Sequence, residues 1–347
     1  MTSTNWIRTS SIALVLITFS ACSTTQNSPT SALKKKAEPF DLQSCVGYLA
    51  SDKLEGRGTG TEGERLAGAY IVEQFQRMGI AEKGTTGYYQ EYAYVPKNPA
   101  QIHQVGDSTK LGMGYAKEVK TRNVIGFIDN GAAHTVIIGS HYDHLGMGDE
   151  NSLWTGEKAI HNGADDNASG VACMLYLAEW LSSKPTNTLQ NNYLFIAFSG
   201  EEKGLFGSNH FTKNPTIDLS KVNYMLNMDM VGRLKENKLA INGSGTASQW
   251  SKIFESCPKT FDIVFSESGV GPSDHTSFYY MDLPVLHFFT GQHEDYHKPS
   301  DDVEKINFEG MKNIGEYMAS LISIADSKGR LPFKKRKMLH QQQPILR

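Results

Sequence analysis

The 347-residue chain lacks several features that would fix its class at once. Its net charge is only −3, so the composition gives no reason to expect nucleic acid as a partner. It has four cysteines and no Cys-X-X-Cys pair, which argues against a disulfide framework but leaves one bridge open among Cys45, Cys173 and Cys257. It contains no Gly-X-Ser-X-Gly nucleophile turn, and the glycine-rich segment 56–60 lacks the Gly-Lys-Ser/Thr ending of a phosphate loop.

A long apolar run is also missing from the N-terminal region. The run from Ile12 to Phe19 has eight residues, too few to span a bilayer, and it is followed by Ser20, Ala21 and Cys22. This pattern is typical of a secretory signal, and Cys22 resembles the lipid-bearing cysteine of bacterial lipoproteins. We expect a signal at 1–21, a flexible tether at 22–37, and an exported protein anchored by a lipid on Cys22 to a bacterial membrane. A periplasmic or secreted protein with an ordinary cleaved signal, or a disordered N-terminus, is the alternative.

The rest of the chain alternates apolar strands with amphipathic helices. Continuous apolar runs favour strands that are buried on both faces. We expect strands at 135–138, 193–198, 222–228 and 283–289, and helices at 61–78, 168–181 and 308–325. This alternation indicates one α/β domain, at 38–327, followed by a solvated tail at 328–347.

Acidic and histidine side chains stand where these strands end. The groups are His141-Tyr-Asp143, Asp165 and Asp166 before the helix at 168, Glu201 with Glu202, Asp229, and His297. Ligands of open α/β sheets bind beyond the carboxyl ends of the strands, so these groups can meet at one edge. Imidazole and carboxylate are ligands that zinc selects. One zinc uses about three protein ligands, so a larger set suggests two metals that share a ligand, for which Asp166 is well placed.

A second zinc motif competes with this interpretation. His293-Glu-Asp-Tyr-His297 matches His-Glu-X-X-His, which binds zinc only when both histidines share one face of a helix. Gly291 and Pro299 leave too few residues between them for a stable helix. We therefore interpret His297 as a ligand and His293 as a surface residue.

The combined motifs resemble the co-catalytic two-zinc aminopeptidase family. That group includes secreted bacterial leucyl aminopeptidases and has glutamate carboxypeptidase and glutaminyl cyclase as relatives. The motifs are His141-Tyr-Asp143, Gly163-Ala-Asp-Asp166-Asn, Ser199-Gly-Glu-Glu202, Asn227-Met-Asp229 and Tyr296-His297, with 49–60 resembling the family's N-terminal segment. The resemblance covers about residues 42–326. It implies a three-layer α/β/α fold with a central mixed, mostly parallel sheet.

The resemblance also implies a role for each site residue. One zinc would lie on His141, Asp166 and Asp229, and a second on Asp166, Glu202 and His297. Glu201 would be the general base, Tyr296 would stabilise the oxyanion, and Asp143 would orient His141. A cis peptide bond would follow Asp166. His275 would lie behind the ligands, whereas His144 and His161 are open between a structural and a functional role.

The expected function is hydrolysis of N-terminal residues from peptides with a free N-terminus. Two other functions stay open from the residues. A glutaminyl cyclase would use one zinc, and a catalytically inactive peptide-binding lipoprotein would have lost the base or a ligand. A carboxypeptidase of the same family is a further alternative.

Overall fold

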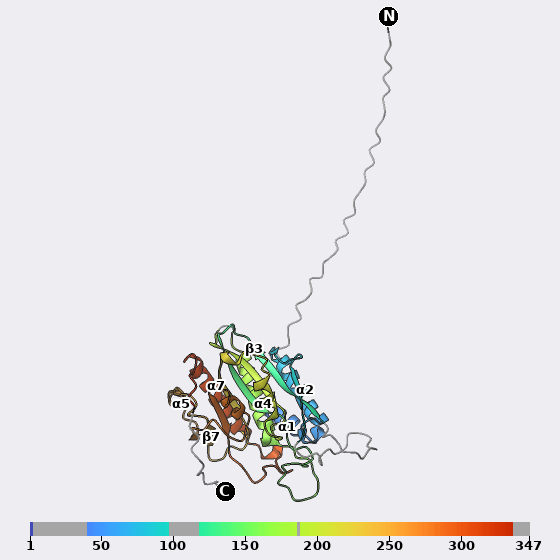
Figure 1. Cartoon of the computed structure of the whole chain (residues 1–347), viewed down its shortest axis with the longest axis vertical. Helices are drawn as coiled ribbons and strands as arrows, with labels where there is room; N and C mark the ends of the chain where they lie inside the picture. The colour runs from blue at the N-terminus through green and yellow to red at the C-terminus, as the bar shows by residue number, and fades with distance from the viewer. Residues whose placement is uncertain (3–39, 97–117, 186–187, 336–347) are drawn as a thin grey trace, which may run out of the picture. The chain divides into compact units, whose positions relative to one another are not determined.

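The computed structural model describes residues 1–2, 40–96, 118–185 and 188–335 (Figure 1). Contacts divide the chain into two units, Met1–Glu38 and Pro39–Arg347, and the description below concerns the second. Nearly all of the predicted signal, Cys22 and the predicted tether lie outside the described residues. In the part of the chain that is described, no helix is both long and apolar enough to span a membrane.

A nine-stranded mixed sheet forms the centre of the domain. Its four central strands are parallel and stand in the order β5 (Asn191–Phe198), β4 (His134–His141), β6 (Val222–Met228) and β9 (Val285–Phe289). Their carboxyl ends therefore reach the same edge. Every residue of β5 and of β6 is buried, as their apolar runs predict.

Antiparallel pairing widens the sheet on both sides. On one side β3 (Val119–Ile128) runs against β5 and also pairs with β2 (Tyr89–Tyr94) and β1 (Ala81–Glu82). On the other side β7 (Lys238–Asn242) runs against β9 and is parallel to β8 (Asp262–Ser266). Four of the eight ladders are parallel, namely the three central ones and that of β7 with β8, and four are antiparallel, so the sheet is mixed with a parallel centre.

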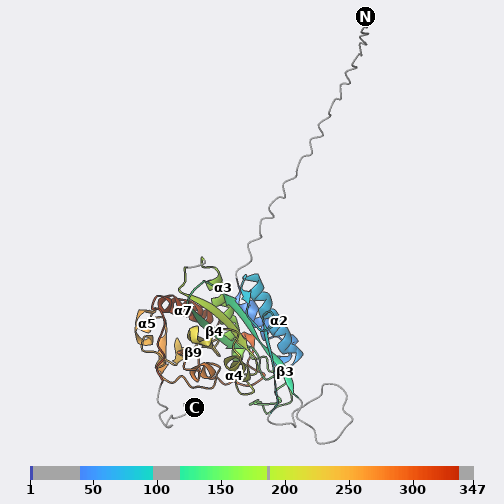
Figure 2. The same cartoon turned by 45° about the horizontal axis from the view of Figure 1, so that its top comes forward.

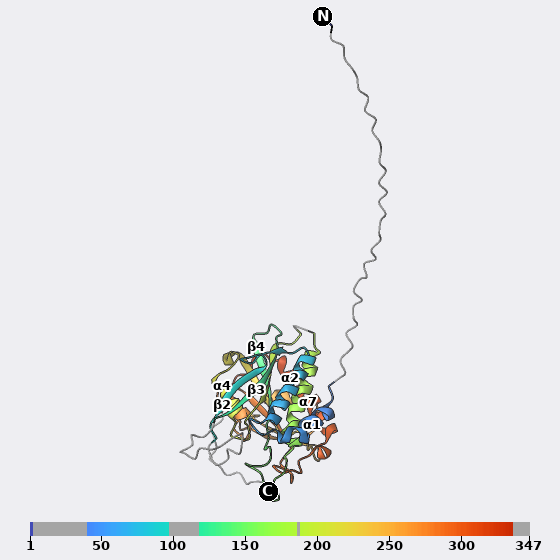
Figure 3. The same cartoon turned by 90° about the vertical axis from the view of Figure 1, so that its right-hand side faces the viewer.

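Helices cover both faces of this sheet, which confirms the expected three-layer fold (Figures 2 and 3). One face carries α1 (Leu42–Leu49), α2 (Glu62–Arg77), α3 (Gly170–Ser182), α5 (Trp250–Ser256) and α7 (Phe308–Asp326). The other carries α4 (Phe206–Lys213) and α6 (His275–Tyr279). Short turns of helix lie at η1 (Asp52–Arg57), η3 (Ala164–Ser169), η4 (Leu219–Lys221) and η5 (Val303–Lys305). The three predicted helices correspond to α2, α3 and α7.

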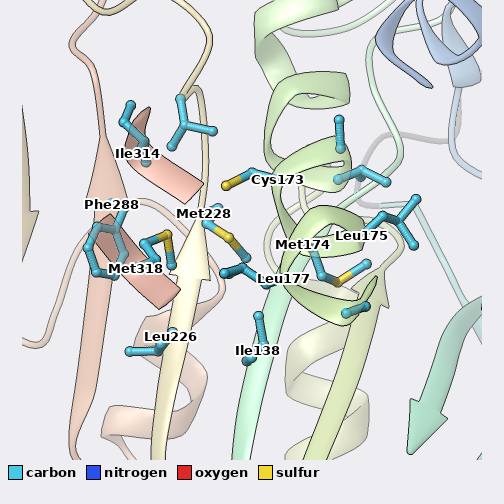
Figure 4. Close-up of a cluster of buried hydrophobic side chains, with 14 of the residues drawn as sticks. Ile138, Cys173, Met174, Leu175, Leu177, Leu226, Met228, Phe288, Ile314 and Met318 are labelled. Carbon is cyan, nitrogen blue, oxygen red and sulfur yellow. The ribbon is translucent and has the colours of Figure 1, made fainter. Parts of the chain in front are cut away.

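The larger apolar core lies between the sheet and the α3/α7 layer (Figure 4). Leu226 of β6 and Phe288 of β9 meet Leu177 of α3 and Met318 of α7, all of them fully buried. Complete burial of such a side chain stabilises the fold by roughly 1.5–3 kcal/mol. Cys45, Cys173 and Cys257, the cysteines that the structure describes, are buried and free.

The first residues of the predicted C-terminal tail lie against the domain. Leu331 is 1% exposed and donates its backbone N–H to Asn223. Phe333 pairs with Ala247 in an isolated bridge and contacts Tyr279. Packed chain therefore continues beyond residue 327, and residues 336–347 lie outside the described part.

Candidate metal centre

The five predicted metal ligands meet at the carboxyl edge of the four parallel strands. His141 is the last residue of β4, Asp229 follows β6 directly, and Glu202 follows β5 after a short turn. Asp166 lies in η3, just before α3, and His297 lies in the loop after β9. The strands therefore bring together residues that are up to 156 positions apart in the sequence.

These side chains form two donor sets that share Asp166. In the first, His141 Nε2 lies 3.3 Å from Asp166 Oδ1 and 3.4 Å from Asp229 Oδ1. In the second, His297 Nε2 lies 3.3 Å from Asp166 Oδ2 and 3.4 Å from Glu202 Oε2. Asp166 thus presents a different oxygen to each set, which is the arrangement of a bridging carboxylate.

The distances and the charge of both sets fit zinc. Nitrogen and oxygen ligands bind zinc at about 2.0–2.2 Å, which places two donors of one tetrahedral ion about 3.3–3.6 Å apart. The four distances above agree with that separation. Burial works to lower the pKa of His297, but the hydrogen bond to Asp166 and the charge of Glu202 outweigh it and raise the pKa to about 9. The cluster therefore carries negative charge that calls for cations.

Each histidine is oriented by a backbone carbonyl on its other ring nitrogen. His141 Nδ1 lies 3.1 Å from the carbonyl oxygen of Asp143, and His297 Nδ1 lies 2.8 Å from that of Asn151. Asp143 thus contacts His141 as expected, but mainly through its backbone, because its carboxylate is 3.7 Å away. With a metal ion bound, a proton on each Nδ1 would leave the Nε2 lone pair, on the side of the carboxylates, free to bind the ion.

Two acids that the motifs did not explain hold Asp166 in place. Asp301 accepts the backbone N–H groups of Asp165 and Asp166, each at 3.0 Å. Burial and the charge of Asp165 raise the pKa of Asp301 to about 6. Asp165 in turn accepts the N–H of Gly232 at 2.6 Å. The expected cis peptide bond joins Asp166 and Asn167.

Glu201 is held beside the metal ligands without belonging to either donor set. Gly200 has φ 67°, which lets the chain turn sharply after β5, and the N–H of Glu201 donates to Asp143 Oδ1 at 3.2 Å. Burial, opposed by His141 and reinforced by Asp229, raises the pKa of Glu201 well above its ordinary value. Glu201 and Glu202 line a cleft of about 660 Å³.

Tyr296 stands next to the second donor set. Its ring stacks on His297 with 3.8 Å between the ring centroids. Burial and the surrounding acids raise the pKa of its phenol, which therefore keeps its proton at neutral pH and can donate a hydrogen bond.

The competing His-Glu-X-X-His motif forms turns and no helix, which confirms its rejection. The expectation that His293 is a surface residue is wrong. Its side chain is only 11% exposed, and its Nε2 lies 3.1 Å from Asp165 Oδ2. The loop between β9 and α7 folds back on η3 and leaves His293 only partly exposed, and no local sequence pattern indicates this contact.

Three other histidines of the sequence analysis also lie near the site. His144 Nδ1 is 2.7 Å from Glu202 Oε1. His161 Nε2 is 2.7 Å from the hydroxyl of Ser152, in a loop that also contacts His297. His275 is buried and stacks on His287, with ring centroids 4.4 Å apart, and neither of its ring nitrogens has a hydrogen-bond partner among the described residues.

Arg57 holds together the backbone behind the site. Its buried guanidinium donates to the carbonyl oxygens of Leu49, Tyr142, Asn162 and Gly163. Burial lowers its pKa to about 10, although the charges of Asp166 and Asp143 oppose this. The side chain therefore stays charged at neutral pH and offsets part of the negative charge of the cluster.

Known proteins resemble this chain over much of its length. The profile of peptidase family M28 matches residues 123–322, more than half of the chain. The aminopeptidase YwaD of Bacillus subtilis is 31% identical over 184 residues, which cover 49% of this chain and 39% of that protein. The chain spans about half the length of the curated relatives it matches.

Solved structures share the fold at lower sequence identity. The zinc aminopeptidase BSAP of Bacillus subtilis is 19% identical, with a TM-score of 0.63 over 86% of this chain and 97% of that one. The glutaminyl cyclase of Porphyromonas gingivalis is 18% identical, with a TM-score of 0.62 over 83% and 97%. The fold alone does not separate these two activities, but the profile match over residues 123–322 assigns the family: the chain belongs to peptidase family M28.

Proposed function

We propose that the chain is an aminopeptidase that holds two zinc ions and removes N-terminal residues from peptides. The observation that carries the proposal is the pair of donor sets that share Asp166, with Glu201 free beside them. His141, Asp166 and Asp229 would hold one ion, and Asp166, Glu202 and His297 the other. The names of YwaD and BSAP support the aminopeptidase reaction.

Each residue then has a chemical task. Zinc, when bound, supplies Lewis acidity to a carbonyl oxygen and lowers the pKa of water to about 7. Glu201 takes the proton from the attacking water and passes it to the leaving amine, a task suited to a carboxyl whose pKa is raised. The phenol of Tyr296 donates to the carbonyl oxygen as negative charge develops there. The carboxylate of Asp143 accepts the backbone N–H of Glu201 and so fixes Glu201, and the backbone carbonyl of Asp143 fixes the ring of His141.

The reaction is tested with peptides that differ only at the N-terminus. Purified protein lacking residues 1–21 is loaded with zinc, and its zinc content is measured by mass spectrometry. It is then incubated with one peptide mixture in free and N-acetylated form.

Stepwise shortening of the free peptides alone supports the proposal and reveals the preferred residue. Loss of ammonia or water from N-terminal Gln or Glu indicates a cyclase instead, and shortening of both mixtures from the other end indicates a carboxypeptidase. No change in either mixture argues for a binding protein.

We further propose that the protein is exported and anchored to a bacterial membrane by a lipid on Cys22. The support is the apolar run 12–19 followed by Ser20-Ala21-Cys22. In a bacterial host, the full chain should sediment with membranes, and Cys22→Ser should move it to the soluble or exported fraction. Sedimentation of the variant with membranes would contradict the anchor.

A further inference from the structure

His144 contacts the second donor set but has no role in the mechanism above. It follows β4 by three residues and is fully buried. Its Nδ1 lies 2.7 Å from Glu202 Oε1 and 3.9 Å from Asp166 Oδ2. His144, Asp166 and Glu202 bring three donor atoms within 4.8 Å of one another, so His144 could replace His297 as a ligand or could act on Glu202.

The distances separate these two roles. Two donors on one tetrahedral zinc lie about 3.3–3.6 Å apart, as the contacts of His297 do. The 2.7 Å between His144 Nδ1 and Glu202 Oε1 is too short for that and is the length of a charge-assisted hydrogen bond. Moreover, the two histidines approach different oxygens of Glu202, with His144 at Oε1 and His297 at Oε2.

The surroundings of the imidazole assign its proton. The backbone N–H of His144 donates to the carbonyl oxygen of Arg57 at 3.1 Å, which anchors the residue. A Cβ on Gly163 would come within 2.4 Å of the imidazole, so the ring lies directly against that backbone. His144 Nε2 is buried without a hydrogen-bond partner among the described residues. A buried N–H without an acceptor is costlier than an unused lone pair, which places the proton on Nδ1, facing Glu202.

We propose that His144 is a positioning residue that donates Nδ1–H to Glu202 Oε1 and leaves Oε2 alone to face the second metal. This inference rests on the proposed function, because it assigns a task toward a zinc on Asp166, Glu202 and His297. The hydrogen bond prevents rotation of the carboxylate and keeps both oxygens from binding the same ion. The His141 set does not depend on it.

The test measures zinc affinity in addition to activity. His144→Ala and His144→Asn are compared with the parent by zinc content and by competition with a chromophoric chelator. Removal of a partner of a metal ligand typically weakens metal binding by about 10–100-fold. We expect His144→Ala to weaken the binding of one of the two zinc ions by that factor. His144→Asn should restore most of the loss, because its amide N–H₂ can take the place of Nδ1–H. His134→Ala, at the other end of β4, is the matched control and should keep both ions.

Each outcome decides between defined alternatives. The positioning role is overturned if His144→Ala binds both zinc ions equally more weakly, or if its zinc affinity is unchanged. Loss of one ion in both variants makes the imidazole itself a ligand and also overturns it. Thermal unfolding of the apo proteins identifies a variant that fails to fold, in which case His144→Asn alone decides. If the parent protein itself binds no second zinc, the proposed function fails, and not only the role of His144. The zinc content of the parent thus distinguishes the two failures.

Discussion

The two halves of the candidate metal centre are built differently, although they share Asp166. The half around His141 stands on strand ends inside the sheet, because His141 ends β4 and Asp229 directly follows β6. The half around His297 stands on loops: His297 has φ 55°, and Asn151 from a distant loop orients it. Strands in mid-sheet are fixed by ladders on both sides, whereas loops open more readily. We therefore expect the His141 half to hold its zinc more tightly.

The largest effect is expected where the halves meet. Asp166→Ala removes one oxygen from each set, so both zinc ions and all measurable turnover should be lost. Zinc content after dialysis and the rate on a free peptide check this. Asp129→Ala, an exposed aspartate, is the control and should behave like the parent. If one ion remained at parental affinity in Asp166→Ala, Asp166 would not bridge.

The second-largest effect is expected at two neighbouring acids, Glu201 and Glu202, whose variants should differ in turnover and zinc content. Glu201→Gln should keep both zinc ions but lose about 10²–10⁴-fold in rate, because only proton transfer is removed. Glu202→Gln should instead lose the zinc of the His297 half. Metal analysis together with kcat distinguishes the two variants. A near-normal rate in Glu201→Gln would exclude Glu201 as the base.

A smaller loss of zinc affinity should be confined to the half around His297. The Asn151 side chain donates to the carbonyl oxygen of Glu202 at 2.7 Å, and its φ is 59°. Asn151→Gly keeps this left-handed backbone and the carbonyl that faces His297, but removes the side-chain bond. We expect about tenfold weaker binding of one zinc. Asn237→Gly, at another left-handed asparagine (φ 54°) on the surface, is the control. Weakening of both ions would show that the halves are not independent.

The same contrast explains which parts of the structure could be predicted from the sequence. The buried parallel strands read as continuous apolar runs, so β4, β5, β6 and β9 were predicted, together with the acids and His141 at their ends. The outer strands were missed because they are short or half-exposed, as the mostly exposed residues of β8 illustrate. Their apolar stretches, such as 124–128 of β3 and 263–265 of β8, are short and are flanked by polar residues.

Residues whose role depends on contacts between loops could not be predicted. Asn151 meets His297 across 146 positions, and Asp301 meets Asp165 across 136. In each contact one partner is a backbone group, the carbonyl of Asn151 or the N–H of Asp165, so no pairing of side-chain types marks them in the sequence. His293 was misassigned for the same reason, because only the folded loop brings it to Asp165.

The smallest effect on turnover is expected behind both halves, at Glu64. This buried carboxyl of α2 accepts hydrogen bonds from Ser199, at the end of β5, from Thr121 and from the N–H of Gly60. Burial and the charge of Asp143 raise its pKa from 4.5 to about 8. Its ionised form is therefore disfavoured by folding, and the stability it contributes is complete below about pH 4.5 and is lost as the pH rises through about 8.

Glu64→Gln removes this ionisation and keeps the side chain neutral. The free energy of unfolding of the parent should fall relative to the variant by more than about 1 kcal/mol between pH 5 and 8. Urea unfolding of the apo proteins at several pH values measures the difference. Glu62 is exposed in the first turn of the same helix, so Glu62→Gln is the control: its free energy of unfolding should change with pH as that of the parent does. If the unfolding free energy of Glu64→Gln changed with pH as that of the parent does, the carboxyl of Glu64 would be ionised in the folded protein throughout this range. The end of β5 would then carry one more negative charge behind the metal centre.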